Sequence, residues 1–195
     1  MTKGRVEAFT DGVIAILITI LVLEFEIPHE ATFAALNPLV PKILSYLMSF
    51  VFVGIYWNNH HHLMHLVRHI DGGCLWANMH LLFWLSLVPA ATAWMGDTHF
   101  GAIPVATYGF VLLMSAVAFT ILVRRLTSRG ANNAALQAAI GRDRKGWLSL
   151  ACYAAAIPLA FVSRWIALGL YVAVAITWFI PDTRMERAVV HEAAD

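Results

Sequence analysis

Charged residues are scarce in this sequence of 195 residues. Lys, Arg, Asp and Glu together make up 13% of it, about half of the roughly 25% found in soluble domains. Hydrophobic residues make up 60%, and the mean hydropathy is +0.70. A globular domain of this length does not bury so many apolar side chains. The composition therefore excludes a soluble enzyme and a disordered chain, and it predicts a membrane protein.

The sequence also has little cysteine and no excess charge of either sign. The formal net charge is +1, so there is neither the basic excess typical of nucleic-acid binding nor an acidic tail. The two cysteines, Cys74 and Cys152, lie inside apolar runs and have no C-x-x-C spacing. We therefore expect no nucleic-acid partner, no disulfide framework and no redox role.

Six apolar runs are long enough to cross a bilayer as helices. A spanning helix needs about 20 apolar residues, because its backbone polar groups must bond within the segment. Only residues 124–145 are hydrophilic at length, so we predict an all-α polytopic membrane protein with one six-helix domain over residues 1–195 and no soluble module. The predicted spans are 8–27, 39–57, 74–96, 101–123, 146–163 and 165–181.

The distribution of Lys and Arg predicts how these spans are oriented, since cytoplasmic loops collect both residues. With a cytoplasmic N-terminus, only Lys42 and Arg164 fall outside. Six spans then place both termini in the cytoplasm. A cleaved signal peptide is the alternative for the first run, but acidic residues interrupt its start and no small-residue cleavage site follows. The cytoplasmic set comprises Lys3, Arg5, Arg68, Arg124, Arg125, Arg129, Arg142, Arg144, Lys145, Arg184 and Arg187.

Asp11 is the most informative acidic residue, because it comes just before the apolar run from Val13 to Leu23. Ionisable residues inside membranes are costly and are functional hypotheses by default. At about 100° per residue, Asp11 points about 140° away from Ile16. We expect it to face other helices, where arginine, histidine or tryptophan donors would satisfy it. A helix cap at the level of the headgroups is the alternative role.

An apolar stripe occupies a different face of the same helix. Its members fall within about 40° of Ile16 on a helical projection. Such a stripe faces lipid, a neighbouring helix or a pore, and periodicity alone does not choose among the three. The stripe comprises Phe9, Gly12, Ile16, Ile20, Leu23 and Ile27.

Five histidines crowd the end of the second run. His61 and His65, and also His65 and His69, are spaced i, i+4, which suits a divalent metal. No Cys, Asp or Glu follows closely before Asp71, so we predict hydrogen-bonding histidines and no metal site. The third run begins with polar residues that predict a helix-packing network at the depth of Asp11. These are Trp76, Asn78 and His80.

Two motifs and the order of the spans resemble a known family. The motifs are Arg5-x-x-x-Phe9-Thr10-Asp11, followed by the Ile/Leu run, and Tyr56-Trp57-x-x-His60-His61. Together they resemble the bacterial branch of the transmembrane protein 175 family of potassium channels, along nearly the whole chain. The family signature is Arg-x-x-x-Phe-Ser-Asp, and Thr10 replaces the serine but keeps its hydroxyl.

The resemblance implies a homotetramer in the bacterial inner membrane, with the first helix of each subunit lining a central pore. It implies passive potassium conduction through a hydrophobic constriction, with no cofactor, no enzymatic step and no partner besides lipid. Ile16, Ile20 and Leu23 match the bulky apolar rings of the constriction, and Thr19 matches a polar position beside them.

The resemblance also implies that Phe9, Thr10 and Asp11 face away from the pore and bond to the second and third helices. The expected partners, with the pairings left open, are Trp57, His60, His61, Trp76 and Asn78. Thr107-Tyr108-Gly109-Phe110 is similar to fragments of the filter loop of ordinary potassium channels. Because it lies in the middle of the fourth run, we predict helix packing for it instead.

Two other classes stay open at this point. A secondary transporter or divalent-metal carrier would use the histidine cluster as its site, and prolines at 89, 104 and 158 leave room for kinked helices. The sequence has neither the inverted repeats nor the broken midplane helices typical of such transporters. A haem protein would need histidines paired across spans near the midplane, whereas these histidines lie at one end.

Overall fold

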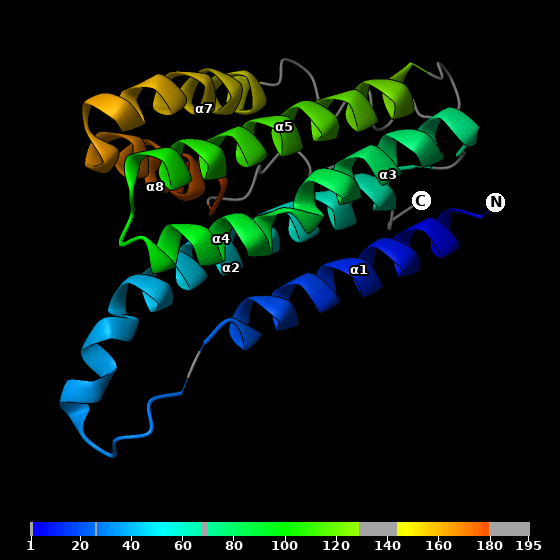
Figure 1. Cartoon of the computed structure of the whole chain (residues 1–195). Helices are drawn as coiled ribbons and strands as arrows, with labels where there is room; N and C mark the ends of the chain where they lie inside the picture. The colour runs from blue at the N-terminus through cyan, green and yellow to red at the C-terminus, as the bar shows by residue number, and fades with distance from the viewer. Residues whose placement is uncertain (1, 26, 68–69, 129–143, 180–195) are drawn as a thin grey trace.

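The computed structural model describes residues 2–25, 27–67, 70–128 and 144–179, which form helices joined by short connections (Figure 1). Within these ranges, five helical segments are long and apolar enough to cross a membrane, and α8 is a shorter apolar helix. The predicted all-α membrane fold is therefore confirmed. The helices are α1 (Lys3–Leu23), the 3-10 helix η1 (Phe33–Leu39), α2 (Val40–His65), α3 (Gly72–Ser86), α4 (Val88–Asp97), α5 (Ala102–Thr127), α7 (Arg144–Val162) and α8 (Arg164–Phe179).

Several residues discussed above lie outside the described part of the chain. They include five of the cytoplasmic arginines, one histidine of the cluster and the end of the last predicted span. They are Arg68, Arg129, Arg142, Arg184, Arg187, His69 and residues 180–181.

The helices differ from the predicted spans at four places. α1 begins five residues and ends four residues before the predicted span 8–27, and α5 continues one turn beyond residue 123. α2 continues two turns beyond Trp57, to His65. The decline in hydropathy after Trp57 marks the edge of the apolar layer and not the end of the helix, because this stretch contains no helix-breaking residue. The third span is built from α3 and α4, which meet at Leu87. Pro89 stands in the first turn of α4, where its missing N–H costs no intrahelical hydrogen bond.

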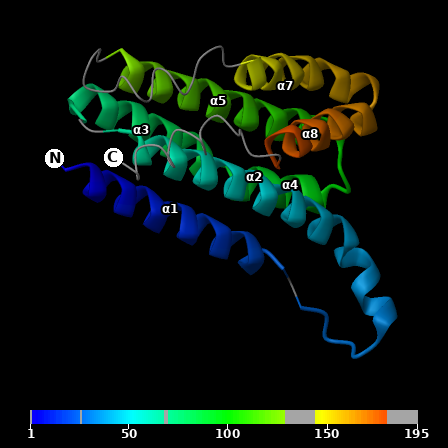
Figure 2. The same cartoon turned by 180° about the vertical axis from the view of Figure 1, so that it is seen from behind.

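The helices form a bundle with α1 at its edge. α1 packs on α2 and makes smaller contacts with α3 and α4, whereas the α7–α8 hairpin packs on α5. Figures 1 and 2 show α1 (dark blue) along one side of the bundle, away from α5, α7 and α8. One side of α1 is therefore left uncovered by the rest of the chain.

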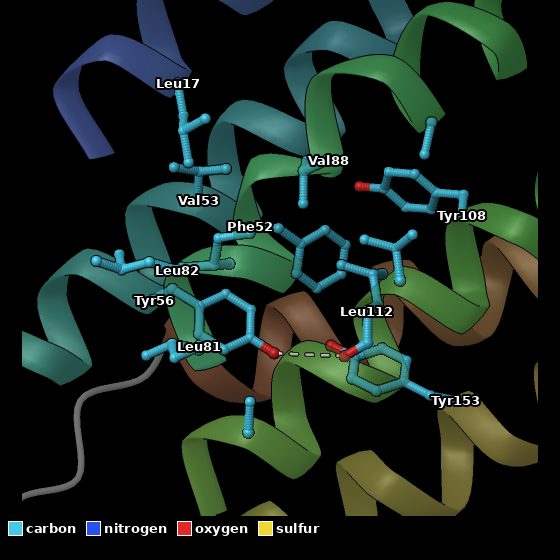
Figure 3. Close-up of a cluster of buried hydrophobic side chains, with 14 of the residues drawn as sticks. Leu17, Phe52, Val53, Tyr56, Leu81, Leu82, Val88, Tyr108, Leu112 and Tyr153 are labelled. Atoms are coloured by element: carbon cyan, nitrogen blue, oxygen red, sulfur yellow. Dashed lines mark hydrogen bonds between the residues drawn. The ribbon is translucent and has the colours of Figure 1, made fainter. Parts of the chain in front are cut away.

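Aromatic and aliphatic side chains from several helices fill the centre of the bundle (Figure 3). Phe52 of α2 packs edge-on against Tyr108 of α5 and Tyr153 of α7, with ring centroids 6.4 and 6.2 Å apart. The Ser49 hydroxyl lies 2.6 Å from the Thr92 hydroxyl and 3.0 Å from that of Tyr108. Hydrogen bonds of this kind between membrane helices average about 0.6 kcal/mol each, so packing provides most of the cohesion.

The two cations predicted to lie outside occupy the same end of the bundle. Lys42 forms an ion pair with Asp97 at the end of α4, with 2.7 Å between Nζ and Oδ1. Arg164 begins α8, and its neighbour Trp165 packs near Phe100, which follows α4, with ring centroids 6.2 Å apart. This arrangement agrees with the orientation derived from the positive charges, which stays a prediction.

Thr107–Phe110 lies inside the continuous helix α5, as predicted for a packing segment. The buried Tyr171 of α8 crosses α5 at Gly109, and its hydroxyl donates a hydrogen bond to the Val105 carbonyl at 3.1 Å. A Cβ atom built on Gly109 would overlap this hydroxyl and would lie 2.7 Å from the ring carbon that carries it. Glycine is therefore required for the close approach of α5 and α8.

Gly109→Ala should destabilise the protein, because the added methyl group displaces Tyr171 and breaks its hydrogen bond. Overpacking of this kind typically costs about 1–3 kcal/mol. Thermal unfolding of the purified protein in detergent measures the loss. Gly169→Ala in α8 is the matched control, since its Cβ would meet nothing within 4 Å. Equal stability of the two variants would show that the helices do not approach as closely as described.

Candidate functional site

The first helix has one buried face and one exposed face. The buried side chains recur every three or four residues and pack against α2, α3 and α4. They are Val6, Thr10, Ile14, Leu17 and Leu21. Opposite them, Ile16 is 58% exposed and Leu23 is 78% exposed. The buried face of the helix therefore contains one polar residue, Thr10, among apolar residues, whereas the exposed face has large apolar side chains that the rest of the chain does not cover.

The exposed face contains the residues that the family resemblance assigns to a constriction. Ile16, Thr19, Ile20 and Leu23 all lie on it. The Thr19 hydroxyl donates a hydrogen bond to the Ile16 carbonyl at 2.8 Å. Its proton is engaged within the helix, and a hydroxyl oxygen that donates its proton still has acceptor capacity.

A buried chain of hydrogen bonds joins α1 to α2 and α3. The Asn78 amide donates to the Thr10 hydroxyl at 2.8 Å, and the Asn78 carbonyl oxygen lies 3.0 Å from Nε2 of His60. Because that oxygen can only accept, Nε2 of His60 carries the proton and its Nδ1 is bare. Nδ1 has no hydrogen-bond partner among the described residues. All three side chains are at most 2% exposed.

Asp11 is satisfied by a donor from the second helix. The indole N–H of Trp57 donates to a carboxylate oxygen of Asp11 at 3.0 Å. The indole ring of Trp57 also stacks on the His61 imidazole, with 20° between the planes. Asp11 therefore points toward α2, as its helical position predicts, and away from Ile16.

Glu7 lies on the same face of α1 as Asp11, and it was not among the residues that the sequence predicted to contact α2. Its carboxylate lies 3.3 Å from Nδ1 of His61, and Nε2 of His61 lies 3.1 Å from Nε2 of His65. Glu7 precedes Asp11 by four residues, so the two acids share a helix face. That spacing is the signal that would have identified it from the sequence.

Three expected members lie elsewhere. Trp76 is 78% exposed on α3 and does not reach the hydrogen-bonded group that the described residues form. Phe9 is 51% exposed on the side of the apolar stripe, and Arg5 is exposed as well. The expectation that Phe9 turns inward with Thr10 is corrected, since successive residues of a helix point about 100° apart.

Comparison with known proteins places these residues in a family. Residues 5–89, which include most of α1 and the whole of α2 and α3, match the family described as endosomal/lysosomal potassium channel TMEM175. A potassium channel of Chryseobacterium sp. is 50% identical over 97% of this chain and 98% of its own length. A potassium channel of Chamaesiphon minutus is 32% identical over 89% of this chain and 91% of its own.

The fold agrees with that of a solved member. The crystal structure of a lysosomal potassium-selective channel TMEM175 homolog from Chamaesiphon minutus matches with a TM-score of 0.78 and 29% identity. The match covers 92% of this chain and 97% of the other. Sequence and fold agree along nearly the whole length, and the chain belongs to the TMEM175 family.

Proposed function

We propose that this protein is a subunit of a passive, potassium-selective channel. The potassium-channel names of its near full-length relatives support the activity. The observation in this chain that carries the proposal is the uncovered apolar face of α1, on a helix whose other face is tied to the bundle by buried hydrogen bonds. The proposed activity needs a permeant potassium ion and involves no enzymatic step and no cofactor.

The proposed assembly is a homotetramer with α1 nearest the fourfold axis. A single subunit has too few helices to enclose a pore, and α1 stands at the edge of its bundle with large apolar side chains uncovered. The exposed apolar face of α1 from a neighbouring copy of the chain would cover these side chains. We place this single six-helix domain in the bacterial inner membrane with both termini in the cytoplasm and no soluble partner.

Ile16, Ile20 and Leu23 would then form three stacked apolar rings. Narrow apolar constrictions control conduction through their width and their wetting. The Thr19 oxygen, with its proton already donated to Ile16, would replace part of the hydration shell of the ion. This mechanism uses no loop of backbone carbonyls, and the position of Thr107–Phe110 inside α5 supports that view.

Cross-linking should detect the contact between copies. Leu23 and Val22 are both exposed, at 78% and 46%, but they point about 100° apart around the helix. In a background with Cys74 and Cys152 replaced by alanine, Leu23→Cys should form disulfide-linked dimers under mild oxidation more readily than Val22→Cys. Equal trapping at both positions would contradict the assignment of the stripe to the pore.

Ion flux should increase when the constriction is widened. Ile16→Ala or Leu23→Ala removes bulk four times around the axis, which should raise flux and reduce discrimination against other cations. The measurement is gradient-driven flux into liposomes, in which the unaltered protein should pass potassium along its gradient alone.

The control for this experiment is Ile166→Ala in α8, which is comparably exposed at 51% but far from α1. Its flux should equal that of the unaltered protein. Unchanged flux in both α1 variants would mean that the narrow point lies elsewhere. Saturable metal uptake in place of potassium flux would identify the protein as a carrier.

Asp11→Ala should weaken assembly before it changes selectivity. The substitution leaves the Trp57 indole N–H without its charged acceptor, a loss of about 1.5–3 kcal/mol. Asp11→Asn keeps an acceptor oxygen and should be milder. Tetramer yield, thermal stability and permeability ratio should be measured on the same preparation. A fully assembled Asp11→Ala protein with altered selectivity would show that Asp11 faces the pore.

A further inference from the structure

Three side chains that can bind a metal converge where α1 begins and α2 ends. They are Glu7, His61 and His65, and their ligand atoms all lie within 4.8 Å of one another. Glu7 and His61 are half-buried, and His65 is exposed, so an ion in solution can reach the group. The sequence predicted no metal site because no acidic residue lies near these histidines along the chain. The acidic residue comes from α1 instead.

The two imidazoles are placed as a metal would require. His61 and His65 are one helical turn apart on α2, and their Nε2 atoms are 3.1 Å apart. Two nitrogen ligands of a tetrahedral zinc ion, each at about 2.0–2.1 Å, are separated by about 3.3–3.4 Å. A movement of a few tenths of an ångström would thus admit the ion, which would replace the single proton that these two nitrogens share.

Glu7 lies on the other side of the His61 ring. Its carboxylate oxygen lies 3.3 Å from Nδ1 of His61. A carboxylate at this distance favours the tautomer with the proton on Nδ1, which leaves the lone pair of Nε2 directed toward His65. A carboxylate that binds the second nitrogen of a histidine is the usual outer partner of metal-binding imidazoles. The stacked Trp57 ring further restricts the rotation of His61.

We propose that Glu7, His61 and His65 form a binding site for a divalent transition-metal ion, best represented by zinc. His61 and His65 bind the ion through Nε2, Glu7 orients His61, and water completes the coordination. Imidazole ligands suit zinc, copper and nickel and disfavour magnesium and calcium. Because Glu7 is on α1 and both histidines are on α2, the ion is bound by α2 alone, and Glu7 connects this site to α1 through His61. This proposal does not depend on the channel activity.

Calorimetric titration with zinc chloride tests the site. The full-length protein, purified in detergent with a tag free of histidine and stripped of metal, should bind one zinc ion per chain at this site. His65→Ala removes a ligand but keeps the backbone carbonyl that accepts a hydrogen bond from Lys3, so the fold should persist. It should abolish this binding. Glu7→Gln should weaken it about tenfold, the usual effect of losing an outer partner.

His29→Ala is the matched control, because His29 is a single exposed histidine in another part of the chain. It should bind zinc like the unaltered protein. Zinc should also raise the thermal midpoint of the unaltered protein and of His29→Ala, but not that of His65→Ala. Equal zinc affinity in His65→Ala and the unaltered protein would overturn the proposal. That result would not contradict the proposed channel activity, which potassium flux measured without zinc tests separately.

Discussion

The side-chain amide of Asn78 sets the rotation of the first helix. It binds Thr10 on α1 and His60 on α2 at once, in a fully buried position. Apolar contacts between membrane helices are weakly directional, since lipid is as apolar as leucine, whereas a hydrogen bond requires one orientation. With Thr10 turned toward Asn78, Ile16 points about 120° away. The exposure of the stripe is therefore a consequence of this bond.

The attachment of α1 changes character along its length. Polar contacts hold the turns from Lys3 to Asp11, whereas Ile14, Leu17 and Leu21 hold the following turns through apolar packing. Phe25 ends this apolar segment by packing edge-on against Tyr46, with ring centroids 5.2 Å apart. The turns that carry Ile16 and Leu23 are thus oriented mainly by bonds formed one to three turns earlier.

Most of the architecture could be predicted from hydropathy and helical periodicity, because lipid requires long apolar runs and a polar residue within them must find partners. The same reasoning predicted that Asp11 faces other helices, whereas Trp57 and Asn78 were named as partners through the family resemblance, with the pairings left open. The prediction that Trp76 joins the same group as Asn78 was wrong. The two residues are two positions apart, so their side chains point about 160° from each other on a helix. Tertiary pairings such as Glu7 with His61 need the register of two helices, which no single run contains.

That register follows a simple rule. α1 and α2 lie antiparallel. When the residue number on α2 rises by four, the residue number of its contact on α1 falls by four. Trp57 binds Asp11, His61 binds Glu7, and the His65 carbonyl accepts from Lys3. A spacing of four keeps all six residues on the facing sides of their helices. The two turns of α2 beyond Trp57 are therefore the part of the helix that brings His61 and His65 beside Glu7. The bond between Trp57 and Asp11 and the contact between His61 and Glu7, which belongs to the cluster that can bind a metal, are therefore successive contacts in one register of α1 against α2.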